Sequence, residues 1–200
     1  TLTLEAVAWT NDSTRATALV NQDNVAVKSG ATDRIYVGSF RTLTSGQTED
    51  SEANRLLCSH YNQVEKPMIK VDGTASWAYG TGAWRAKNTD AGNKISAVIG
   101  IAGQTINVEN HALCSKASGA GTGHIGIDLD GSSDGDTTVM PVIEAASGRD
   151  LRTAKYQGVP AAGYHYWTAM EYGAGSVDIT FYGDYASLTN KNGIMGSVLV

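Results

Sequence analysis

The sequence predicts an all-β domain, an antiparallel β-sandwich of jelly-roll or Greek-key type with at most one or two short helices. Apolar and polar residues alternate with a period of two along most of the chain, which is typical of half-buried strands. Clusters of Gly, Asn, Asp and Ser separate the alternating segments. No segment of about 10–15 residues between them has a helical period, so parallel βαβ units are not expected.

About ten short strands follow from the alternation. The expected strands are Leu2–Trp9, Arg15–Val20, Arg34–Arg41, Met68–Val71, Lys94–Ile101, Ile106–Ser115, His124–Asp130, Tyr164–Tyr172, Val177–Tyr182 and Ile194–Val200. Strands at this spacing, joined by turns, favour antiparallel sheets of jelly-roll or Greek-key type over βαβ units.

Helix is expected only as isolated turns. The better candidate is Glu49–Leu57, where Asp50 or Ser51 is suited to cap a helix N-terminus. Glu144–Tyr156 is a weaker candidate, because it lacks a clean 3.6-residue period and has Gly148 in its middle. No linker divides the chain and no segment repeats, so residues 1–200 are expected to form one domain.

The composition of the chain argues against two classes of function, nucleic-acid binding and membrane insertion. The chain has 200 residues, 15 Lys+Arg against 20 Asp+Glu, and a formal net charge of −5. A basic stripe suited to nucleic acid is absent from the sequence, so no nucleic-acid partner is expected. The longest nearly apolar run, Ile95–Gly103, is far shorter than the roughly 20 residues of a membrane-spanning helix, so no membrane insertion is expected.

Because Thr1 begins directly in an alternating segment, we expect the chain to continue a longer protein.

The two cysteines leave three alternatives open. Cys58 and Cys114 can be buried free thiols, which is the commonest state of unpaired cysteine, or can form one disulfide. Together with His60 and His111 they also make a Cys2His2 set that zinc accepts. The spacings differ from those of structural zinc sites, so buried free thiols are the expectation and no metal is assigned.

An acidic turn raises the question of calcium. Asp128, Asp130, Asp134 and Asp136 fall within nine residues, and the segment from Asp130 to Gly135 follows the start of a calcium-binding loop. Pro141 occupies the position where such a loop carries its last acidic ligand. Calcium binding and a solvated acidic hairpin turn are therefore both left open.

Two catalytic motifs occur in contexts that do not suit them. Gly121–Gly126 matches the G-x-G-x-x-G of dinucleotide sites, but a strand follows it in place of a helix. Gly131–Gly135 matches the G-x-S-x-G of a nucleophile elbow, again without a following helix. Glu171, near the C-terminal aromatics, is interpreted as lying on the outward face of its strand, as are Asp178 and Asp184. We expect no enzyme activity, no catalytic residue and no cofactor.

The aromatic residues point to binding. Trp77 and Tyr79 share one face of a strand, and the turn at Gly80–Gly82 separates them from Trp84. Their flat apolar rings with polar tips suit stacking on sugar rings and contacts between proteins. Trp77, Tyr79 and Trp84 are therefore the predicted ligand- or receptor-binding residues.

Several short segments resemble, in matching order, a module of tail-fibre and other virion proteins of tailed bacteriophages. They are Arg15–Asp23, Val27–Thr32, Tyr36–Thr42, Gly46–Ser51, Tyr61–Asn62, Pro67–Met68, Trp77, Gly163–Tyr166, Tyr182–Asp184 and Gly193–Gly196.

The resemblance implies a β-rich structural module at the C-terminal end of a longer virion protein, assembled as a homotrimer. Its expected partners are other virion proteins and a host surface glycan or other receptor, and its expected location is the virion. The family offers no catalytic residues. An alternative from another class is a carbohydrate-binding module of a secreted bacterial protein, which would use Trp77, Tyr79 and Trp84. A glycan-degrading enzyme with a carboxylate pair is a third interpretation.

Overall fold

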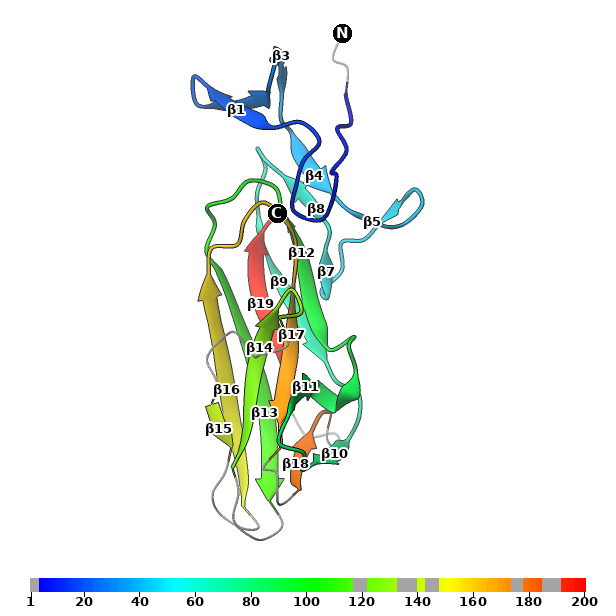
Figure 1. Cartoon of the computed structure of the whole chain (residues 1–200), viewed down its shortest axis with the longest axis vertical. Helices are drawn as coiled ribbons and strands as arrows, with labels where there is room; N and C mark the ends of the chain where they lie inside the picture. The colour runs from blue at the N-terminus through cyan, green and yellow to red at the C-terminus, as the bar shows by residue number, and fades with distance from the viewer. Residues whose placement is uncertain (1–3, 117–121, 133–139, 143–147, 174–177, 185–191) are drawn as a thin grey trace.

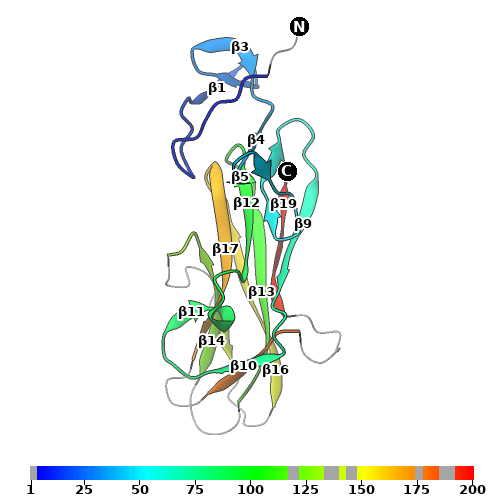
Figure 2. The ribbon, with the colours of Figure 1, turned by 90° about the vertical axis from the view of Figure 1, so that its right-hand side faces the viewer.

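The computed structural model describes residues 4–116, 122–132, 140–142, 148–173, 178–184 and 192–200. It confirms the all-β class: two curled antiparallel sheets pack face to face, as Figures 1 and 2 show from two sides. The one helical element in the described part is the 3-10 turn η1 (Lys87–Thr89). No helix there is long and apolar enough to be a candidate for crossing a membrane.

The first sheet, called the β17 sheet, is built around β17 (Gly163–Tyr172). Strand β14 runs along one edge of β17, and β11 and then β12 run along the other edge. Short β7 pairs with β12 in parallel, which departs from the purely antiparallel expectation. The other strands of this sheet are β7 (Asn54–Arg55), β11 (Trp84–Ala86), β12 (Lys94–Ile99), β14 (Gly123–Leu129) and β15 (Met140–Val142).

The second sheet, called the β13 sheet, is built around β13 (Ile106–Lys116). Strand β16 pairs with β13 along one edge, while β19 and β18 follow each other along the other. The other strands are β9 (Glu65–Val71), β10 (Ser76–Tyr79), β16 (Arg149–Gly158), β18 (Ile179–Tyr182) and β19 (Gly193–Leu199).

The core lies between these sheets in two clusters. Trp167 is fully buried in the larger cluster, with Ile95 and Val108 from the facing sheets. The smaller cluster contains Cys114 and Phe181 and lies nearer β10. Every second residue of β17 points into this core, so the intervening residues lie on the outer face of the β17 sheet.

Residues 4–64 form an N-terminal arm that extends from one end of the sandwich (Figure 1). It joins the sandwich through β7 and through Leu56 and Cys58, which belong to the larger core cluster, and otherwise consists of small sheets with few buried residues. Its strands are β1 (Leu19–Gln22), β2 (Val25–Lys28), β3 (Ala31–Ile35), β4 (Gly38–Phe40), β5 (Thr42–Thr44), β6 (Gln47–Thr48) and β8 (Leu57–Ser59).

Three local expectations are wrong. Glu49–Leu57 is not helical: Asp50 pairs with Arg55, and two short strands follow. The expected strand Leu2–Trp9 is not formed over its described part, where only Trp9 makes an isolated bridge, to Arg15. The weaker helix candidate Glu144–Tyr156 is not helical over its described part, most of which belongs to strand β16; Ala154 is the only fully buried residue of β16, so this polar strand shows little alternation.

Candidate functional site

Three aromatic rings form a row on the outer face of the β17 sheet. Strand register places Trp84 of β11 opposite Tyr172 of β17, and Tyr172 opposite His124 of β14. The ring centroids of Trp84 and Tyr172 are 5.3 Å apart, and those of Tyr172 and His124 are 5.5 Å apart. All three side chains are half-buried, so each ring keeps part of its surface open to solvent.

The neighbouring residues explain why the row faces outward. Ile125 and Glu171 alternate with His124 and Tyr172 along their strands and are fully buried in the interior. Trp84 lies against Gly126, where an added Cβ would stand 3.2 Å from the indole Cη2 atom. Because Gly126 has no side chain, the indole can rest against the sheet.

The same outer face continues toward the arm with polar and then aromatic residues. Thr168 lies opposite both Lys94 and Asp128 in the next row, where Thr168 and Asp128 are buried and the half-buried Lys94 carries the ammonium group. Beyond it stand Tyr166, with the Lys94 ammonium 4.7 Å from its ring centroid, and Tyr164. We call this surface, from Trp84, Tyr172 and His124 through the polar row to Tyr166 and Tyr164, the aromatic strip.

The dimensions of the strip suit an extended ligand. Tyr172 and Tyr164 are eight residues apart on one strand, which corresponds to about 27 Å at about 3.4 Å per residue. The Arg41 guanidinium lies 3.5 Å from the ring centroid of Tyr164 and pairs with Asp12, so the arm closes the upper end of the strip.

His124 has an unusual environment within the row. Burial lowers the pKa of His124, which favours the neutral imidazole at neutral pH. Its Nδ1 atom is buried, and no described residue provides it with a hydrogen-bond partner. Because this nitrogen is buried, His124 contributes to the row through its ring and not through Nδ1.

The structure separates the three predicted binding residues. Trp84 lies in the aromatic strip, but Trp77 and Tyr79 pack against the smaller core cluster. The Trp77 indole stacks on Phe181, with ring centroids 6.1 Å apart, and its Nε1 donates to Glu171 at 2.7 Å. The Tyr79 hydroxyl donates to the Ala83 carbonyl. Trp77 and Tyr79 therefore hold β10 in place, and they do not share a platform with Trp84.

The interpretation of Glu171 as an outward residue is wrong. Its carboxylate is fully buried and accepts hydrogen bonds from Trp77, from Arg85 Nε at 2.7 Å and from the Asn88 backbone N–H at 3.2 Å. Burial raises the pKa of Glu171, while these donors act in the opposite direction. The arrangement joins β10, β11 and η1 through one side chain, which is a structural role.

Lys87 is a second buried charge beside this network. It is 1% exposed, and its Nζ donates to the His111 carbonyl at 2.8 Å. Burial lowers the pKa of Lys87 to about 8. Lys87 also lies close to the Trp77 ring, with its Nζ 5.9 Å from the centroid, so the lower end of the sandwich is unusually polar inside.

The acidic turn is described only in part, since Asp134 and Asp136 lie outside the described residues. Asp128 accepts a hydrogen bond from Ser132. Asp130 accepts one from the Tyr166 backbone N–H and pairs with His165 Nδ1 at 2.8 Å. This hydrogen bond to Asp130 raises the pKa of His165. In the described part of the chain no group of three or more metal-ligating side chains is gathered, so calcium binding is left open for the complete turn.

The two cysteines are separate buried free thiols. Cys58 belongs to the larger core cluster and Cys114 to the smaller one. Burial raises the pKa of both thiols, that of Cys114 to about 12. They do not meet with His60 and His111 as a zinc set among the described residues.

Comparisons with known proteins add little. No protein-family model matches the chain, and a comparison with curated proteins finds no match. Among solved structures, the C-terminal domain of EclA, a sugar-binding protein, aligns at 11% identity with a TM-score of 0.34, over 72% of this chain and 96% of that chain. A likeness at this level carries no functional argument, and the site is judged on its own geometry.

Proposed function

We propose that this chain is a non-enzymatic binding module that holds a glycan on the aromatic strip. The observation that carries the proposal is the row of Trp84, Tyr172 and His124, whose rings lie side by side across three adjacent strands. Ring faces favour the C–H surfaces of sugars, and nearby polar groups fix their hydroxyls. The half-buried Lys94 supplies such a group in the next row of the same face, where its neighbours Thr168 and Asp128 are buried.

An array of bacterial surface polysaccharides tests this proposal. The wild-type chain is expected to bind a subset of the array, and Trp84→Ala is expected to weaken that binding by at least about tenfold, as loss of a central aromatic anchor does. Leu151→Ala is the control, because Leu151 is 53% exposed but lies on β16 of the other sheet. Equal binding by wild type and Trp84→Ala would contradict the proposal.

A second proposal concerns the setting in which the module acts. We propose that the chain is part of a virion protein of a tailed bacteriophage, a tail-fibre, spike or head-fibre domain that assembles as a homotrimer and contacts other virion proteins. The arm supports this proposal, because ten large apolar residues on it are exposed. They are Leu4, Val7, Val20, Ile35, Val37, Phe40, Leu43, Leu57, Tyr61 and Val64.

Few side chains of the arm are buried, so the arm has little hydrophobic core of its own to stabilise it. Phe40 and Leu57 are cross-strand partners, yet they are 56% and 48% exposed. Two- and three-stranded sheets without a covered apolar face are marginal in water, so association with further copies would stabilise them.

The molecular mass in solution distinguishes a trimeric virion domain from a monomeric carbohydrate-binding module. A trimer of about 63 kDa, three times 21.0 kDa, is expected from light scattering, and Phe40→Glu is expected to shift it toward monomer. A wild-type monomer that binds soluble glycan would instead support a carbohydrate-binding module of a secreted bacterial protein.

A further inference from the structure

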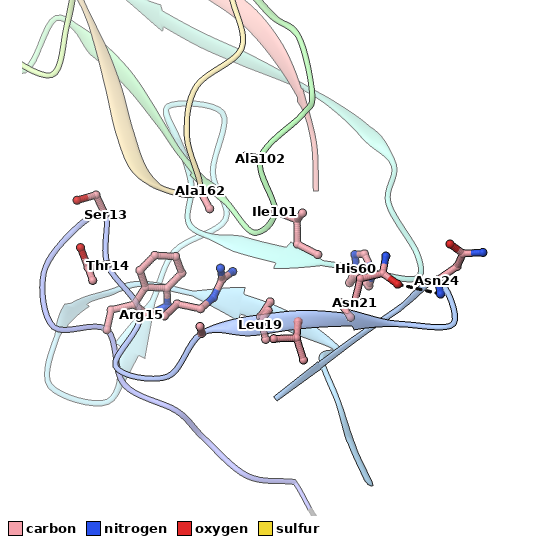
Figure 3. A pocket seen from close by; sticks show the side chains of 14 residues that line it. Ser13, Thr14, Arg15, Leu19, Asn21, Asn24, His60, Ile101, Ala102 and Ala162 are labelled. Atoms are coloured by element: carbon pink, nitrogen blue, oxygen red, sulfur yellow. Dashed lines mark hydrogen bonds between the residues drawn. The ribbon is translucent and has the colours of Figure 1, made fainter. Parts of the chain in front are cut away.

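A pocket of about 640 Å³ lies where the arm meets the sandwich, away from the aromatic row. Figure 3 shows Arg15 in this pocket, with Ser13 and Thr14 on one side and Ile101 and Ala162 on the opposite wall. The volume falls within the usual range of small-ligand pockets, about 300–1,000 Å³.

The charge of the pocket differs from that of the chain. The chain carries a net charge of −5, yet the described residues that line the pocket include Arg15 and His60 and no carboxylate. Two acids are next to lining residues in the sequence: Asp12, which is paired with Arg41 at 3.1 Å, and the exposed Asp23 beside Asn24. Neither is among the residues that line the pocket, so Arg15 has no carboxylate partner there.

Arg15 is held in place without an ion pair. Its Nη2 donates to the Gly100 carbonyl, and its guanidinium lies 4.4 Å from the Trp9 ring centroid and 5.1 Å from that of Tyr36. In the described part of the chain no carboxylate pairs with it. Five other arginines do have a carboxylate partner there: Arg34, Arg41, Arg55, Arg85 and Arg152.

From this geometry we infer that the Arg15 pocket binds the carboxylate of an acidic sugar of monosaccharide size. A planar guanidinium fork fixed by aromatic rings matches a carboxylate well. Asn24 offers an amide and Thr14 a hydroxyl, which suits a ring bearing several hydroxyl groups. Asn21 Oδ1 accepts from the Asn24 backbone N–H and the Ser13 hydroxyl donates to Asn11, so these two side chains keep only part of their hydrogen-bonding capacity. Leu19 and Ile101 form the apolar part of the wall.

Calorimetric titration with glucuronate and galacturonate tests the inference, with glucose and galactose as neutral counterparts and acetate as a simple anion. The uronates are expected to bind at least tenfold more tightly than either the neutral sugars or acetate. Arg15→Gln is expected to abolish this preference. The matched control Arg34→Gln should retain it, because Arg34 is paired with Glu5 on the same arm.

Because Arg15 also joins the arm to the sandwich, a second variant keeps the test decisive if Arg15→Gln fails to fold. Ile101→Trp fills the pocket and leaves Arg15 intact, and it is expected to lose uronate binding. Equal binding of uronate and glucose, acetate binding as tight as uronate, or binding unaffected by Ile101→Trp would overturn the inference. Trp84→Ala should leave uronate binding unchanged, so failure here is distinguishable from failure of the aromatic strip.

Discussion

The indole of Trp84 in β11 reaches across β17 to Gly126 of β14, into a space that a side chain at position 126 would occupy. This contact links a backbone position to the proposed function, because a residue without a Cβ makes room for the Trp84 ring beside Tyr172 and His124, with its plane tilted by 58° and 47° from theirs.

Gly126→Val tests that link directly. A Cβ at this position would stand 3.2 Å and 3.3 Å from two Trp84 ring atoms, so the ring must move outward. Glycan binding is expected to fall by about tenfold. The free energy of unfolding should change by less than about 1.5 kcal/mol, because valine is favoured in strands and the displaced ring is half-exposed. Unchanged glycan affinity would show that the contact of Trp84 with Gly126 does not matter for binding.

Glu171 is expected to be a stability residue. Glu171→Ala leaves Trp77 Nε1 and Arg85 Nε without their buried acceptor, and a loss on the order of 3 kcal/mol in the free energy of unfolding is expected. Urea denaturation measures it. Glu65→Ala is the control, since Glu65 is an exposed glutamate, and it should change stability by less than about 1 kcal/mol. Equal effects of the two substitutions would contradict the structural role.

The buried Lys87 is expected to make the free energy of unfolding depend on pH in the alkaline range. Its pKa is lowered to about 8 in the folded chain, so between pH 8 and its ordinary value of 10.5 the unfolded chain binds more protons. The penalty for burying the charged form is complete below pH 8 and disappears as the pH rises. Relative to Lys87→Met, wild type should gain about 1 kcal/mol per pH unit over this window. Parallel stability profiles for the two proteins would contradict the lowered pKa.

His165 predicts the opposite trend near neutrality. Asp130 raises the pKa of His165 above its ordinary value of 6.5, so the stabilisation is complete below that value and is lost as the pH rises through the folded-state pKa. Asp130→Asn is a mild test, because asparagine tolerates the positive φ of 58° at this position. Wild type should lose more stability than Asp130→Asn between pH 6 and pH 8, as measured by denaturation. If wild type and Asp130→Asn lost the same stability between pH 6 and pH 8, the His165–Asp130 pair would be excluded as the cause of the pH dependence.

The long strands of the sandwich could be predicted from sequence because their alternation is strong. Strand β17 alternates between buried and half-buried residues over its first half, is buried throughout Trp167–Glu171, and lies within one residue of its expected bounds. Strand β16 lacks that signal, since its outer residues are polar, and the pairing of Asp50 with Arg55 outweighs the local helix-capping signal at Glu49–Leu57.

The candidate site was only partly predictable. Trp84 was expected, but its neighbours Tyr172 and His124 are 88 and 40 positions away, and only strand register brings them together. Trp77 carries the same chemistry as Trp84, yet β10 closes the end of the sandwich and turns it toward Glu171. The type of a side chain indicates what it can bind, whereas the direction in which the side chains of a short strand point depends on the strands that it pairs with.

The indole N–H resonances offer the most direct measurement of the central claim. The chain has four tryptophans, so four such signals are expected, and single substitutions assign them. During titration with an oligosaccharide selected from the array, the Trp84 signal should shift progressively. Those of Trp77 and the fully buried Trp167 should stay in place. A shift of Trp77 with Trp84 unmoved would contradict glycan binding on the aromatic strip.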